Sequence, residues 1–226
     1  MKAAFLALIA ALAWSQPAAA QLDRISNKQA VAALRIALEK GSRAAVSSLG
    51  RTDGFFGNAR VKIPLPESLQ RAEGWMRRLG MGRYADELVL TMNRAAEAAV
   101  PEARTLLVGA VKKMTVEDAK GILTGGDTAG TAYFRRTTED QLRARFLPIV
   151  SRATARVRLA EKYNQYADTG VRFGLLSRED ANLDAYVTQK ALDGLFLVIA
   201  DEEKKIRQDP VESASSIIRK VFGALR

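Results

Sequence analysis

The apolar residues of this chain recur at intervals of three and four over most of its length, and this spacing limits the fold more than any other feature. In the segment 27–49, for example, the pattern is formed by Val31, Leu34, Leu38 and Val46. Alternation with a period of two never persists beyond a few residues, so the sequence predicts no sheet. Because there is also no internal repeat or long linker, we expect one compact all-α domain of about eight to ten helices.

Glycine and proline mark the expected breaks between helices. A loop over 50–66 is predicted by Gly50, Gly54, Gly57, Pro64 and Pro66. We expect helices around it at 27–49, 67–79, 83–100 and 101–114. Thr115 and Asp118 have the spacing of a capping box, so a shorter helix should begin there and end near Thr124.

The following segment contains three further signals. Asp127 or Thr128 is expected to cap a helix. Thr137 repeats the capping pattern with Asp140, which predicts a new helix start. Pro148 is then expected to kink or break that helix.

The last third predicts a long helix that begins at 177–180 and ends near Gln208. Its middle is apolar on nearly every side, which is typical of a central helix surrounded by others. Glu203 and Arg207 are spaced as an i,i+4 ion pair, and this pattern favours an exposed C-terminal end.

The N-terminus has the order of a secretory signal. Lys2 is followed by an apolar run over 3–14 and by small alanines at 18–20. The run is shorter than a membrane span, and no later segment is long and apolar enough to span. We therefore expect cleavage between Ala20 and Gln21 and a single helical domain at 21–226 without a transmembrane segment. An uncleaved anchor is the alternative.

The chain contains no cysteine and no histidine. This excludes thiol nucleophiles, the Ser-His-Asp triad and ordinary zinc sites. An enzyme built on this sequence would have to use carboxylates. Asp193 is the most notable acid because apolar residues flank it, and a buried acid is a candidate for catalysis. The sequence indicates no second acid that would act together with Asp193, so we assign no catalytic residue, metal ligand or cofactor.

The formal net charge is +10 at pH 7. In an exported protein this balance does not point to nucleic acid. The compatible partners are an anionic component of the envelope, such as lipid head groups, or an acidic periplasmic protein. A basic surface that only improves solubility is the alternative.

The loop at 50–58 is a first candidate site, because its glycines let the backbone approach a ligand closely. Its candidate ligand-binding residues are Arg51, Asp53 and Asn58. The alternative is a structural loop, in which the two adjacent phenylalanines pack on the core and Asp53 begins a turn.

The segment 124–128 leads into a helix N-terminus and is a second candidate site. Backbone N–H groups there would suit a phosphate or carboxylate. The candidate residues are Thr124, Asp127, Arg135 and Arg136. The segment lacks the lysine and the spacing of a P-loop. A glycine helix end followed by an aspartate cap is the alternative.

A basic stretch lies at 135–162, with eight Arg or Lys residues and three acids. On one continuous helix, Arg145, Arg152 and Arg156 would lie within about 40° of one another, beside an apolar stripe. Such a face suits docking on an anionic surface, provided that the helix continues past Pro148. A solvated face is the alternative.

Six segments, in their order along the chain, resemble sequences of the bacterial family catalogued as domain of unknown function 4197. They are GRTDGF at 50–55, IPLP at 63–66, MNRAAE at 92–97, AKGILTG at 119–125, YFRRTT at 133–138 and YVTQKALDGLF at 186–196. The resemblance implies an exported protein of Gram-negative bacteria, and therefore the periplasm. It implies no activity, ligand or catalytic residue.

We therefore expect a periplasmic binding or interaction module without catalytic activity, with a groove near 50–58 or 124–136. Docking on anionic lipid through the basic stretch is the second hypothesis. An enzyme that uses carboxylates is the third.

Overall fold

The computed structural model describes residues 27–157, 159–161, 163, 182–210 and 215–223, with the backbone alone at 71 and 72. Within these ranges the chain forms eight α-helices, one short 3-10 helix and no strand. The prediction of a single all-α domain with this number of helices is confirmed.

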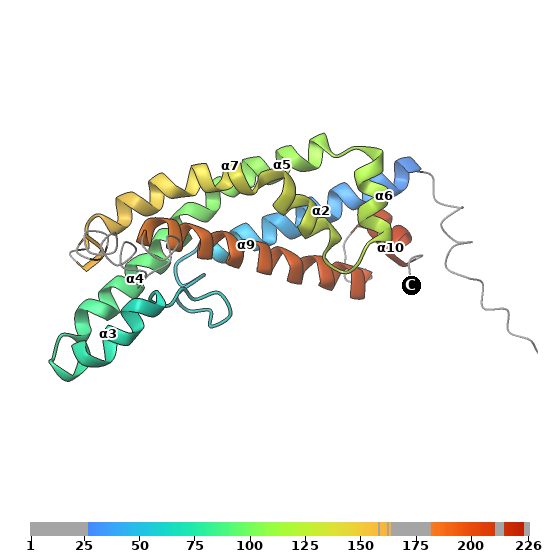
Figure 1. The fold of residues 1–226 in the computed structure, drawn as a ribbon. Helices are drawn as coiled ribbons and strands as arrows, with labels where there is room; N and C mark the ends of the chain where they lie inside the picture. The colour runs from blue at the N-terminus through green and yellow to red at the C-terminus, as the bar shows by residue number, and fades with distance from the viewer. Residues whose placement is uncertain (1–26, 158, 162, 164–181, 211–214, 224–226) are drawn as a thin grey trace, which may run out of the picture.

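Four long helices run along the length of the molecule (Figure 1). They are α2 (Asn27–Leu49), α4 (Gly82–Ala99), α7 (Ala129–Thr154) and α9 (Leu183–Gln208). Helix α9 packs against the other three and most extensively against α7, so the expected central position is confirmed. The 3-10 helix Val100–Glu102 joins α4 to α5 (Ala103–Lys113), which packs against α2 and α7.

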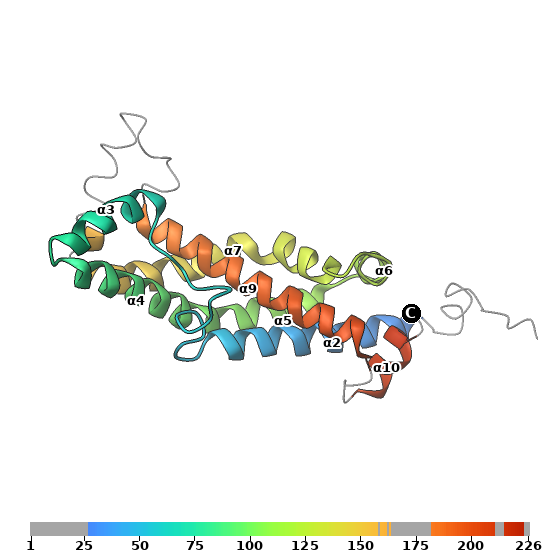
Figure 2. The ribbon, with the colours of Figure 1, turned by 90° about the horizontal axis from the view of Figure 1, so that it is seen from below.

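The two ends of the bundle carry the shorter helices (Figures 1 and 2). At one end, α3 (Glu67–Arg78) and α4 form a hairpin. At the other end lie α6 (Val116–Thr124) and α10 (Ser216–Gly223). Among the described residues, no helix combines the length and the apolar character that crossing a membrane requires.

Four phenylalanines from different parts of the chain are fully buried in the core, Phe55, Phe134, Phe146 and Phe196. Phe55 comes from the loop and packs against α9 at Gly194. A Cβ atom on Gly194 would lie 2.7 Å from Phe55 Cε1, so this glycine makes the close approach possible.

Several helix ends for which the sequence contains a local signal lie where they were predicted. Helix α2 has the predicted bounds, and α9 ends at Gln208 as predicted. Thr115 and Asp118 form the expected capping box, with Asp118 N donating to Thr115 Oγ1 at 3.0 Å and Thr115 N to the Asp118 carboxylate at 3.1 Å. Asn182 caps the start of α9, whereas the predicted start at 177–180 lies outside the described residues.

Helix α7 is continuous where the sequence predicted two helices and a kink or break. Thr137 lies inside it and donates its hydroxyl to the Tyr133 carbonyl at 2.8 Å. Pro148 also lies inside, and the helix continues to Thr154. Phe146 and Val150 are completely buried on either side of the proline, so packing offsets the lost hydrogen bond.

Candidate functional site

The first half of the 50–66 loop is held by two side chains of α4. The buried Glu97 carboxylate accepts the N–H groups of Phe55 at 3.0 Å and Phe56 at 3.1 Å. Arg94 donates to Glu97 at 2.6 Å and to Asp53 at 2.8 Å. Asp53 itself has a φ of 65°, in the left-handed region. These contacts match the structural alternative for the loop.

The three candidate residues of this loop do not converge on a cavity. Arg51 is exposed to solvent. Asp53 is engaged by Arg94, while the Asn58 side chain accepts the backbone N–H of Arg60 at 3.2 Å within the turn. None of the three lines the groove described below.

The second half of the loop is fixed by Asn93 of α4. Its side chain accepts Ile63 N–H at 2.8 Å and donates to the Ile63 carbonyl at 2.9 Å. Tyr186 of α9 donates its hydroxyl to the Pro64 carbonyl at 3.1 Å. These bonds hold the segment 60–64 alongside α9.

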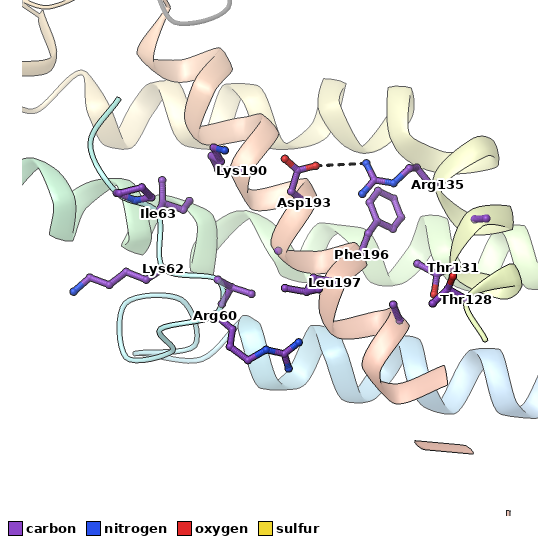
Figure 3. A pocket seen from close by; sticks show the side chains of 15 residues that line it. Arg60, Lys62, Ile63, Thr128, Thr131, Arg135, Lys190, Asp193, Phe196 and Leu197 are labelled. Atoms are coloured by element: carbon purple, nitrogen blue, oxygen red, sulfur yellow. Dashed lines mark hydrogen bonds and ion pairs between the residues drawn. The ribbon is translucent and has the colours of Figure 1, made fainter. Parts of the chain in front are cut away.

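A groove of about 680 Å³ lies between this segment, the start of α7 and one side of α9 (Figure 3). Of the two candidate segments, 124–136 lines the groove through residues 128–135. The segment 50–58 contributes no lining residue, and the neighbouring 60–64 forms that wall. Pro64, Ala132 and Leu197 supply exposed apolar surface, and charged side chains surround it. This volume and lining are in the range of small-molecule sites.

Arg135 is the sequence-predicted residue that the structure places in the groove. Its guanidinium lies 4.6 Å from the centre of the Phe196 ring. Nη1 is 3.5 Å from Asp193 and 3.3 Å from Glu139, both longer than a normal charge-assisted hydrogen bond. With 42% of its side chain exposed, Arg135 retains donors for an added anion.

The other cations of the groove differ in availability. Lys190 has no carboxylate within ion-pair distance among the described residues, and its ammonium lies 5.6 Å from the Tyr186 ring. Arg60 is held by Asp201 at 2.6 and 3.1 Å. Lys62 points away from α9 (Figure 3). The positive charge open to a ligand therefore belongs mainly to Arg135 and Lys190.

The first N–H groups of α7 are occupied by the protein itself. Glu203 of α9 accepts Gly130 N–H at 2.9 Å, Thr131 N–H at 2.8 Å and the Thr131 hydroxyl at 2.9 Å. Arg207 pairs with the same carboxylate at 2.9 Å; Glu203 is buried, with 7% of its side chain exposed, and Arg207 is largely buried, with 11% exposed. This corrects two expectations, namely that these amides await an anion and that the Glu203–Arg207 pair lies on an exposed end.

The other candidate residues of this segment, Thr124, Asp127 and Arg136, do not line the groove, whereas the adjoining Thr128 does. Thr124 donates its hydroxyl to the Lys120 carbonyl at 2.9 Å, and Asp127 is exposed. Thr128 occupies the N-cap position of α7 without a side-chain capping bond, because Glu203 takes that role. Arg136 lies 3.3 Å from Asp118 and lines a separate depression of about 440 Å³ between α5 and α7.

The three arginines of the basic stretch do not share one helix face. Arg145 and Arg152 are exposed on α7, with Arg145 3.7 Å from Glu102 and Arg152 Nε donating to the Pro148 carbonyl at 3.1 Å. Arg156 follows the end of the helix at Thr154. Helix α7 continues past Pro148 but ends before Arg156. The prediction that the three arginines lie on one helix face is therefore wrong.

Asp193 lies in the groove and is not buried, since 45% of its side chain is exposed. Its carboxylate accepts a hydrogen bond from Gln189 at 3.1 Å, besides its long contact to Arg135. Flanking apolar residues predicted burial wrongly because Asp193 stands on the side of α9 that borders the groove. The described residues contain no cluster of acids that would suit a metal ion.

Sequence reasoning missed the residues that shape the groove. Asn93 and Glu97 are one helical turn apart among alanines, so a polar pair on an apolar helix face was the available signal. For Glu203 the i,i+4 spacing suggested a surface ion pair. Its partners at the start of α7 are more than 70 residues away, and no local pattern indicates them.

The comparisons with known proteins concern the family rather than a function. No curated protein and no solved structure matches the chain. A family model described as "Protein of unknown function (DUF4197)" matches residues 24–223. This range includes every residue of the groove and of the contacts that hold the 50–66 loop. The chain therefore belongs to the DUF4197 family.

Proposed function

We propose that this protein is a binding module without catalytic activity, whose groove takes a ligand with an anionic group beside an apolar part. The observation that carries the proposal is Arg135, partly exposed and lying on Phe196 at the wall of the groove. A planar guanidinium held in this way is arranged for a carboxylate or phosphate.

The groove offers both parts of the recognition. The apolar part would contact Pro64 and Leu197, while the anionic group would bind Arg135 with Lys190 nearby. Such a ligand would compete with Asp193 for the guanidinium. That competition is weak, because exposed ion pairs contribute only about 0–1 kcal/mol.

The proposal assigns no reaction to the groove. A carboxylate mechanism requires two acids with separate roles in one cleft. Asp193 is partly exposed and already in contact with Arg135, and Glu139 does not line the groove. Nothing in this arrangement favours catalysis by carboxylates.

Calorimetric titration with octyl phosphate tests this proposal, with neutral octyl glucoside as the matched ligand. Octyl phosphate should bind, and Arg135→Gln should weaken it about 10-fold or more, as expected for losing a hydrogen bond to a charged group. The neighbouring Arg136→Gln is the control, because Arg136 lines the separate depression. Equal binding of both ligands, or equal loss in both variants, would contradict the proposal.

We also propose that the protein acts in the periplasm after cleavage between Ala20 and Gln21. The order of charge, apolar run and small residues at 1–20 supports export. Mass spectrometry of the protein recovered from a periplasmic extract should give an N-terminus at Gln21. Recovery of the chain with Met1 retained in the membrane fraction would instead indicate an anchor.

A further inference from the structure

The α3–α4 hairpin ends in a tip of exposed apolar side chains. Trp75 is 67% exposed and Leu79 is 69% exposed. Met81 and Tyr84 are also exposed, so four large apolar residues lie within ten positions of the chain. A cluster of this kind on a protein surface marks an interaction site more often than chance exposure does.

The tip has a defined turn. Gly80, with a φ of 76°, lies where the chain reverses between the two helices. Leu79 N–H donates to the Trp75 carbonyl at 3.1 Å, and Met81 N–H donates to the Met76 carbonyl at 2.8 Å. Helix α3 packs mainly against α4, and the hairpin lies at one end of the bundle (Figures 1 and 2).

The charged residues of the tip are arginines, with acids at its base. The segment 74–85 contains three arginines and no acid. Arg77 is paired with Glu73 at 2.7 Å and with Asp86. Arg78 lies 5.4 Å from the Trp75 ring, and Arg83 lies 4.9 Å from the ring of Tyr84. Two cations thus stand beside the exposed aromatic rings.

We propose that the hairpin tip is a docking surface for a bilayer that contains anionic phospholipid. Tryptophan and tyrosine favour the membrane interface because they combine an apolar ring with a polar edge. Arginine places its apolar stem among the acyl chains and its charge at the head groups. The segment 74–85 combines these residue types without an acid of its own, and the nearest acids, Glu73 and Asp86, are paired with Arg77.

The shape of the tip favours a bilayer over a folded protein partner. A stable protein interface buries about 800 Å² on each side, which four apolar residues at the tip of one hairpin do not supply. A fluid bilayer can surround a projecting tip and contact all its sides. Because the tip belongs to α3 and α4, this proposal stands or falls independently of ligand binding in the groove.

Fluorescence of Trp75 reports on the tip directly. The sequence contains two tryptophans, Trp14 and Trp75, and the protein that begins at Gln21 retains only Trp75. Vesicles of phosphatidylcholine with phosphatidylglycerol should shift its emission to shorter wavelength at low salt, and brominated lipid should quench it. Pure phosphatidylcholine vesicles should have a much weaker effect, and added salt should reverse the shift.

The arginines supply the matched variants. Arg78→Gln with Arg83→Gln should weaken binding to the phosphatidylglycerol vesicles about 30-fold, which corresponds to ~2 kcal/mol for two charges near an anionic surface. Arg51→Gln with Arg104→Gln changes the net charge equally at exposed positions outside the hairpin and should leave binding within about 2-fold. Circular dichroism of all variants checks that the helices are retained.

Three results would overturn the proposal. The first is an unchanged Trp75 emission with every vesicle at low salt. The second is vesicle binding that both double variants retain equally, which would place the contact elsewhere. The third is a shift that depends on protein concentration without lipid, which would identify the tip as a contact between two copies of the chain.

Discussion

Two buried glutamates perform the same structural task in different parts of this protein. Glu97 accepts two consecutive backbone N–H groups of the 50–66 loop, and Glu203 accepts two at the start of α7. Each is also paired with an arginine of its own helix, Arg94 or Arg207. A carboxylate satisfied in this way can be buried without an unpaired charge.

Glu203→Gln should lower the free energy of unfolding by about 3 kcal/mol or more. The substitution keeps the shape of the side chain but leaves Arg207, 11% exposed, without its counter-charge. Urea denaturation measures the loss. Glu202→Gln is the control, because Glu202 pairs with Lys205, which is 71% exposed, and its loss should stay below about 1 kcal/mol. Equal losses of stability in the two variants would show that the Glu203–Arg207 pair stabilises the fold no more than the exposed pair does.

The contribution of Asp118 to stability should depend on pH. The hydroxyl and the N–H of Thr115 hold the pKa of Asp118 below its ordinary value. Because the pKa is lower in the folded protein, the carboxylate stabilises the fold above the ordinary pKa, and this stabilisation disappears as the pH falls through the folded value. Asp118→Asn should therefore unfold more easily than the parent protein at about pH 6, by about 0.5–1 kcal/mol, and the difference should shrink below about pH 3. A constant difference across this range would contradict the assignment.

At the scale of elements, helix ends with a local cause were predictable and ends set by tertiary contacts were not. The capping box at Thr115 involves residues three positions apart, so the sequence contains all of it. Thr137 has similar neighbours but lies within α7. Its hydroxyl bonds inside the helix, and the adjoining Phe134 is completely buried. Core packing there decides against a new helix start.

Gly194 in α9 tests whether packing or helix propensity decides at this position. Alanine usually stabilises a helix relative to glycine by about 1 kcal/mol. Gly194→Ala should instead destabilise the protein by about 1–3 kcal/mol, because the new Cβ would lie 2.7 Å from Phe55. Gly109→Ala in α5 meets no atom within 4 Å and should be neutral or stabilising. Thermal denaturation of the two variants compares the signs directly, and a shift of the same sign in both would contradict the packing argument.

At the scale of the whole molecule, the groove depends on contacts that the sequence does not reveal. Its walls come from 60–64, the start of α7 and the middle of α9. The candidate segments 50–58 and 124–136 adjoin these walls, yet Arg135 is the one predicted site residue among the groove-lining residues of the described chain. Asn93 holds Ile63 in place by a hydrogen bond between residues 30 positions apart in the sequence. A contact between residues so far apart leaves no periodic or local pattern in the sequence.

The groove and the hairpin tip use different surfaces of the same bundle. The groove lies along α7 and α9, while the tip lies at the end formed by α3 and α4 (Figures 1 and 3). Helix α4 links them, because Asn93 holds the groove segment and the other end of α4 begins beside the tip. A molecule that docks through the tip would therefore leave the groove open to a ligand.

Amide chemical-shift mapping with octyl phosphate tests the central claim most directly. The account predicts that shifts concentrate at 60–64, 128–135 and 190–197, and that Arg135→Gln removes them while Arg136→Gln retains them. Shifts spread over the basic surface, or confined to the α3–α4 tip, would contradict the assignment of the groove as the binding site.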